Sequence, residues 1–107
     1  MLVVNRFVVD GDDADFRTRA GTALAALAAR PGYLRGRLAR AYDDPTAWTL
    51  LTEWESVGAY RRALSAYEVK VHATRWLAGS LDEPSAFEVL AQAEPGGAVK
   101  TTGSDLA

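Results

Sequence analysis

The chain has 107 residues, a formal net charge of -2 and a pI of about 5.3, and it contains one histidine and no cysteine. Disulfides, thiol nucleophiles, thiolate metal sites and histidine-rich metal centres within one chain are therefore excluded. A chain of this length is expected to form a single domain. Because nucleic-acid-binding proteins usually carry a basic face, we expect no nucleic-acid partner.

Nothing in the sequence indicates a membrane or an export route. No segment approaches the roughly 20 apolar residues of a membrane-spanning helix. The first residues lack the basic region and long apolar run of a signal peptide. We therefore expect a cytoplasmic protein without a membrane partner.

The first half of the chain predicts a strand, a helix and a second strand. Residues 2–9 are rich in β-branched and aromatic side chains, which favour a strand. Residues 14–30 place apolar side chains at helical spacing, and Pro31 and Gly32 end that helix. Residues 33–42 then predict a second strand with alternating arginines.

The second half predicts a third strand, helical segments and a last strand. Residues 48–54 alternate with a period of two and lead into Ser56, a residue type that caps helices. Helical spacing continues as far as Gly79, and residues 85–90 predict the last strand. The side chains expected to face inward from these helical segments are Val57, Tyr60, Leu64, Tyr67, Val69, His72, Ala73 and Trp76.

The order of these elements is β-α-β-β-α-β, which predicts a ferredoxin-like α+β fold, an antiparallel sheet with helices on one face. We assign residues 1–91 to this domain and residues 92–107, rich in glycine and threonine, to a flexible tail. The first strand is apolar on both faces, although a sheet with one face in water should alternate. We therefore expect a homodimer packed through the uncovered face, with Arg6 paired to an acid of the partner; the alternative is that the tail covers this face.

The segment WTLLTEWES, residues 48–56, is the most informative for function. It places Trp48 and Trp54 on one face of one strand, a large apolar surface that something must cover. Asn5 is a single amide in the otherwise apolar row of the first strand. An amide and an indole on neighbouring strands can form a pocket with one polar group.

These motifs together resemble the antibiotic biosynthesis monooxygenase family of dimeric α+β barrels. The resemblance covers residues 1–91 and rests on the element order, on VVNRF, on RPGYLRGRL and on LLTEWES followed by a helix. It implies that Asn5 matches the first-strand asparagine of active members and Trp54 their third-strand tryptophan. The family includes cofactor-free oxygenases of aromatic polyketides, quinol oxygenases, haem-degrading monooxygenases and small proteins of unknown role.

The haem-degrading members carry an iron-ligating histidine on the helix that follows the tryptophan. This chain has Arg62, Ala63 and Leu64 in that region, and its histidine, His72, lies further along. Haem therefore stays as an alternative that would need His72 or a tyrosine as the ligand. No dinucleotide fingerprint or P-loop is present, and we expect no cofactor.

Oxygenation without a cofactor requires an electron-rich substrate, because the reaction of triplet O2 with a closed-shell molecule is spin-forbidden. The protein must bind a flat aromatic or quinol-like molecule in a dry pocket, assist its deprotonation and stabilise negative charge. The catalytic candidates are Asn5 for charge stabilisation, Trp54 as a pocket wall and His72 as a proton acceptor. The candidate substrate-binding residues are Phe7, Trp48, Tyr60 and Tyr67.

Each candidate also has a structural interpretation. Phe7, Trp48, Trp54, Tyr60 and Tyr67 fit core positions, and the Asn5 amide can bond to neighbouring backbone. The arginines of the second strand, Arg35, Arg37 and Arg40, are most simply solvated or at the dimer rim. A non-catalytic binding protein of the same fold is therefore the alternative to an enzyme.

Overall fold

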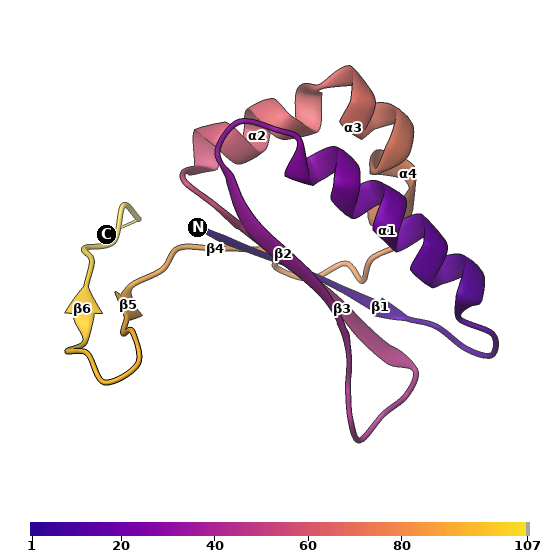
Figure 1. The fold of residues 1–107 in the computed structure, drawn as a ribbon, viewed down its shortest axis with the longest axis horizontal. Coiled ribbons are helices and arrows are strands. Elements are labelled where there is room, and N and C mark those ends of the chain that lie inside the picture. The colour runs from indigo at the N-terminus through magenta and orange to yellow at the C-terminus, as the bar shows by residue number, and fades with distance from the viewer. Residues whose placement is uncertain (107) are drawn as a thin grey trace.

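The computed structural model of the chain describes residues 1–106 (Figure 1). Its elements follow the order β1 Leu2–Val8, α1 Ala14–Ala28, β2 Tyr33–Arg40, β3 Ala47–Trp54, α2 Val57–Ser65, α3 Tyr67–His72, α4 Thr74–Leu77, β4 Ala86–Phe87, β5 Ala91–Gln92 and β6 Lys100–Thr101.

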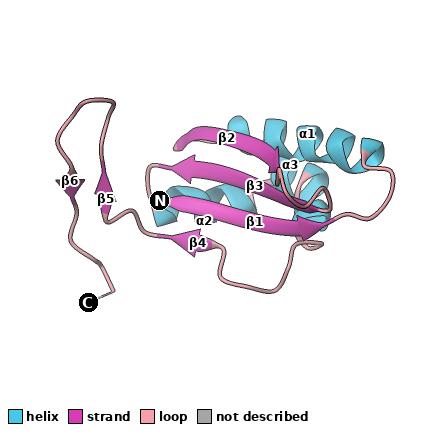
Figure 2. Cartoon of the chain, turned by 90° about the horizontal axis from the view of Figure 1, so that it is seen from below, coloured by secondary structure: helices cyan, strands magenta, loops and turns pink. Residues whose placement is uncertain are grey.

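The main sheet is antiparallel, with the strand order β2-β3-β1-β4. All the helices cover one face of this sheet, and the opposite face carries none (Figure 2). The ferredoxin-like α+β architecture predicted from the element order is therefore confirmed. β4 is shorter than the predicted strand because the chain leaves the edge of β1 after Phe87 and pairs beyond Leu90 with its own C-terminal segment.

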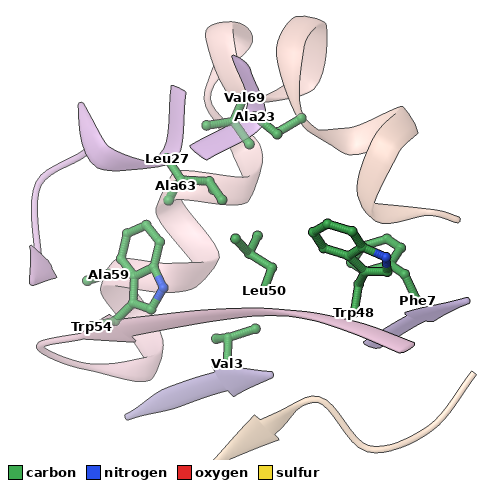
Figure 3. Packing of buried hydrophobic residues seen from close by; sticks show 11 residues of the cluster. Val3, Phe7, Ala23, Leu27, Trp48, Leu50, Trp54, Ala59, Ala63 and Val69 are labelled. Atoms are coloured by element: carbon green, nitrogen blue, oxygen red, sulfur yellow. The ribbon is translucent and has the colours of Figure 1, made fainter. Parts of the chain in front are cut away.

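The core lies between the sheet and the helices, and β3 is its centre. This strand alternates strictly, with Trp48, Leu50, Thr52 and Trp54 buried on the helix side (Figure 3). The helices contribute mostly small side chains where the sheet contributes indoles, so the helices lie close to the sheet. The buried alanines are Ala20, Ala23, Ala59, Ala63 and Ala73.

Three of the predicted inward positions on the helices are wrong. Tyr67 is 75% exposed, Val57 is 46% exposed, and His72 lies on the surface. For Tyr67 and His72 the cause is Ala66, whose extended backbone (ψ 140°) separates α2 from α3 and changes the direction in which the next turn faces. Val57 is the first residue of α2 and precedes this break. Val69 and Ala73 take the inward positions of the segment that follows.

The turn at Pro31 and Gly32, just before β2, packs closely against α2. Gly32 has φ +87°, and a Cβ built there would overlap the Cβ of Ala59. Gly32→Ala should therefore lower the free energy of unfolding by about 1–2 kcal/mol for the left-handed backbone and by about 1–3 kcal/mol more for the overlap. Urea denaturation measures this loss.

Gly11 provides the matched control for this substitution. It also has a left-handed backbone (φ +78°), but a Cβ there meets nothing within 4 Å. Gly11→Ala should carry the backbone cost alone. Equal losses in the two variants would show that the contact between Gly32 and Ala59 contributes nothing.

The C-terminal segment forms the two-stranded β5-β6 hairpin, which projects beyond the end of the main sheet (Figures 1 and 2). The predicted flexibility of this segment stays a prediction, and its last residue, Ala107, lies outside the described residues. Across residues 1–106, no helix has the length and apolar character needed to cross a membrane.

Candidate functional site

The helix-covered face of β1 and β3 carries four of the predicted site residues, Asn5, Phe7, Trp48 and Trp54. In the register of these strands, Asn5 lies opposite Leu50, and Phe7 lies opposite Trp48. Trp54 is four residues along β3 from Leu50, which at about 3.3 Å per residue corresponds to roughly 13 Å. Asn5 is therefore nearer to Trp48 than to Trp54, and the two indoles lie at opposite ends of β3 (Figure 3).

Asn5 is the polar group of this surface. It is half-buried, and its side-chain amide makes no hydrogen bond to any of residues 1–106. Its backbone oxygen accepts a bond from Thr49 Oγ1 at 3.4 Å, so the expected alternative of an amide tied to backbone is not what the structure has. A partly buried amide without a protein partner is available to a ligand.

Trp54 lies at the α2 end of β3 and is fully buried. Its Nε1 donates to Thr52 Oγ1 at 2.9 Å, so its one polar group is satisfied internally. The rings of Tyr33 and Tyr60 pack against the indole at centroid distances of 5.4 and 5.5 Å. Trp54 is thus anchored in the core and does not present its N–H to a ligand.

Burial raises the pKa of Tyr60 above the ordinary value of 10.0, and it also raises the pKa of Tyr33. Both phenols are therefore protonated at neutral pH and can donate a hydrogen bond. The sequence interpretation missed Tyr33. The sequence feature that could have indicated Tyr33 is its position directly after the Pro31-Gly32 turn. This position places Tyr33 opposite Trp54 in the pairing of β2 with β3.

Trp48 lies at the other end of β3, in a cluster of four rings. Phe7 contacts Trp76 at a centroid distance of 4.3 Å, and Phe16 contacts Trp48 at 5.3 Å and Trp76 at 5.2 Å. Neither the Trp48 nor the Trp76 Nε1 has a hydrogen-bond partner among the described residues, although both atoms are buried. Trp76 was predicted to face inward from helical spacing, which does not indicate which rings it meets.

Two guanidinium groups lie over the Trp48 ring, Arg40 at 5.1 Å and Arg17 at 5.9 Å from its centroid. Arg40 also pairs with Asp13 at 3.0 Å, which ties the start of α1 to the end of β2. The Arg40 side chain is still 46% exposed, which agrees with the expected solvated position, and a place at the dimer rim stays a prediction.

His72 is not brought to this surface. Its side chain is 44% exposed, and its Nε2 lies 3.2 Å from the carboxylate of Glu68 one turn earlier on α3. It lines a groove between α1 and the α3–α4 segment. The predicted catalytic residues Asn5, Trp54 and His72 thus occupy three separate places.

The family model for antibiotic biosynthesis monooxygenases matches residues 1–75. The chain is also 35% identical over 101 residues to the deoxynogalonate monooxygenase of Streptomyces nogalater, covering 94% of this chain and 84% of that protein. The chain belongs to the antibiotic biosynthesis monooxygenase family. This confirms the family that the sequence motifs resembled.

Solved structures share the fold of this chain. SnoaB, described as a cofactor-independent oxygenase from Streptomyces nogalater, superposes with a TM-score of 0.66 at 33% identity, covering 83% of this chain and 94% of that one. A protein from Mycobacterium tuberculosis superposes with a TM-score of 0.67 at 18% identity, covering 87% and 97%, and shows the fold alone.

Within this family framework, the haem alternative requires an iron ligand that faces the sheet. His72 lines the groove between α1 and the α3–α4 segment instead. Among residues 1–106, no group of three or more His, Cys, Asp or Glu side chains could hold a metal ion.

Proposed function

We propose that this chain is a cofactor-independent monooxygenase that uses O2 to oxygenate a flat aromatic or quinol-like molecule. The observation that carries this proposal is the Asn5 amide, which has no hydrogen-bond partner among residues 1–106. The other side chains of this face are rings, aliphatic groups and the Thr52 hydroxyl, which accepts from Trp54 Nε1. The identity with the deoxynogalonate monooxygenase supports the reaction class.

The reaction balances without an external reductant. A CH2 group activated by a neighbouring carbonyl, as in an anthrone, loses a proton, and the carbanion passes one electron to O2. The resulting radical pair joins as a hydroperoxide, and loss of water leaves a new carbonyl group. The sum is CH2 plus O2 giving C=O plus H2O.

The side chains contribute orientation and electrostatics to this sequence. The Asn5 Nδ2 donates a hydrogen bond to the substrate carbonyl oxygen, which gains negative charge as the proton leaves. Flat walls come from rings on both sides of Asn5. Trp48 and Phe7 lie on one side, and Trp54 and Tyr60 lie towards the α2 end of β3. The role of His72 as proton acceptor stays a prediction, because its imidazole faces the groove beyond α1.

Oxygen consumption by the purified, chelator-treated protein against a panel of anthrones and dihydroxynaphthalenes tests this proposal. Heat-denatured protein controls for the slow autoxidation of these compounds. Protein-dependent uptake would support the oxygenase. Binding of the panel without uptake would instead support the non-catalytic binding protein.

We also propose a homodimer that packs through the outer face of the sheet, which carries no helix (Figure 2). Leu2, Val4 and Leu51 lie on this face, and Val8 on the same face is 59% exposed. Arg6 pairs with Glu83 of its own chain at 3.3 Å, and its expected pair with an acid of the partner stays a prediction. The apolar character of the face therefore carries the proposal.

Leu51→Arg should convert the dimer to a monomer, because it places a third cation beside Arg35 and Arg37 on the packed face. Sedimentation velocity at micromolar concentration measures the change. Ala25→Glu, an exposed position on α1, is the control and should stay dimeric. A wild-type protein that sediments as a monomer would remove the basis of this proposal.

A further inference from the structure

The Trp76 indole covers Phe7, one of the rings proposed to form the walls of the site. The two rings lie at a centroid distance of 4.3 Å with 34° between their planes, and Trp76 also contacts Phe16 at 5.2 Å. Phe7 lies two residues from Asn5 on the same face of β1, and it is only 4% exposed. Trp76 therefore occupies the place in which a flat ligand would pack on Phe7.

We propose that Trp76 is a plug, an indole that fills this stacking position until a flat ligand displaces it outward, a role that rests on the proposed function. Asn5 and Phe7 line none of the main grooves on residues 1–106. A flat molecule can therefore lie against both of them only after a side chain has moved.

Trp76 has space to move into. Its indole also lines a groove of about 220 Å³ between α1 and the α3–α4 segment. Trp48, by contrast, is 6% exposed and lines none of the main grooves. The groove beside Trp76 carries the hydroxyls of Thr18 and Thr22, which can accept a hydrogen bond. An outward movement of the indole thus leads into open and partly polar space.

The closed arrangement leaves the Trp76 N–H without a partner. Its Nε1 is buried and has no acceptor among residues 1–106, and the same holds for Trp48. Buried donors nearly always have a partner, and leaving one without a partner costs free energy. Outward movement gives the Trp76 N–H water or a threonine hydroxyl, which offsets part of the cost of separating the rings.

The helix that carries Trp76 is short and weakly anchored. α4 spans the four residues Thr74–Leu77, with no side-chain cap at its start and no buried residue. Ala73 before it is buried and has a non-helical backbone (φ -126°, ψ -39°). After it, the Leu81 N–H donates to the Arg6 carbonyl of β1 at 2.7 Å. α4 can therefore move between two fixed points while the rest of the core stays folded.

Binding of anthraquinone, a flat probe with no CH2 group to oxygenate, tests the plug by the sign of the effect. In the wild-type protein the closed position raises the apparent Kd by the reciprocal of the fraction of time that it is open. Trp76→Ala should therefore bind at least about tenfold more tightly, as expected for a position that is open less than about a tenth of the time. A tryptophan that only formed a wall for the ligand would have the opposite effect. Isothermal titration calorimetry measures the Kd.

Val71→Ala is the matched control, because Val71 is an exposed apolar residue of α3 that lines the same groove. Its Kd should equal that of the wild type. Trp76→Phe keeps a ring beside Phe7, and its Kd should lie between those of the wild type and Trp76→Ala. Urea denaturation shows whether each variant is folded.

Hydrogen exchange on the wild-type protein provides a second measurement that needs no variant. The amides of Leu77 and Ala78 donate to the carbonyls of Ala73 and Thr74 in the closed arrangement. Saturation with anthraquinone should make these two amides exchange faster, because the ligand displaces α4. A ligand that bound without moving α4 would leave their exchange unchanged or slower.

Several outcomes would overturn the plug. Equal or weaker binding by Trp76→Ala would do so, as would an equal gain in Val71→Ala or binding of the probe by neither protein. Unchanged or slower exchange of the α4 amides would exclude the movement. Tighter binding by Trp76→Ala and faster α4 exchange, without oxygen uptake on the substrate panel, would leave the plug in place and remove only the proposed reaction.

Discussion

Asn5→Ala is expected to lower kcat for oxygen consumption by about 10²–10³-fold, the usual effect of removing one hydrogen-bond donor that faces a developing negative charge. The fold should survive, because the amide makes no hydrogen bond to the described residues and is half-buried. Oxygen-electrode assays with the best substrate of the panel measure kcat, and urea denaturation measures stability in parallel.

Gln92→Ala is the matched control for this loss. It removes the chain's other carboxamide side chain, which lies exposed on the β5-β6 hairpin. Its kcat should equal that of the wild type. An Asn5→Ala protein that keeps more than about a tenth of the wild-type kcat would contradict the charge-stabilising role, since the loss would then be smaller than that of one such donor.

Trp54→Ala is expected to lower the free energy of unfolding by about 3–5 kcal/mol, the cost of removing a fully buried large aromatic side chain. The loss includes the contacts with Tyr33 and Tyr60 and leaves the buried Thr52 hydroxyl without its donor. Urea denaturation monitored by far-UV circular dichroism measures it.

Trp54→Phe separates packing from the hydrogen bond. It keeps an aromatic ring and should cost less than Trp54→Ala. Combined with Thr52→Val in a double-mutant cycle, it isolates the coupling between the indole and the hydroxyl, for which we expect about 0.5–1.5 kcal/mol. A Trp54→Ala protein within 1 kcal/mol of the wild type would show that this end of the core is loosely packed.

The central strands of the sheet could be predicted from the sequence, because β3 alternates without exception and Pro31-Gly32 fixes where β2 begins. It was insufficient for the segment after Ser65. Ala66 adopts an extended backbone there, and alanine is a good helix former that gives no local signal of a break. Tyr67 and His72 were therefore assigned to the wrong face, and the reason lies in tertiary packing.

The candidate site could be predicted only as a shared face. Period-two alternation places Asn5, Trp48 and Trp54 on one side of the sheet, but the distance between them depends on strand register. The place of Arg17 over Trp48 follows from how α1 crosses the sheet, and Arg40 lies opposite Trp48 in the register of β2 and β3. Spacing along the chain carries no information on such pairs.

The strand order β2-β3-β1-β4 also has a consequence for how the chain folds during synthesis. β2 and β3 are neighbours in sequence and can pair as a local hairpin, whereas β1 pairs with β3 and β4, which are made later. Long-range pairing is slow, and an unpaired apolar strand is prone to aggregate. A nascent chain that has not yet reached Trp54 therefore exposes β1 without a partner, and this is the stage at which a chaperone would have most effect on the yield of folded protein.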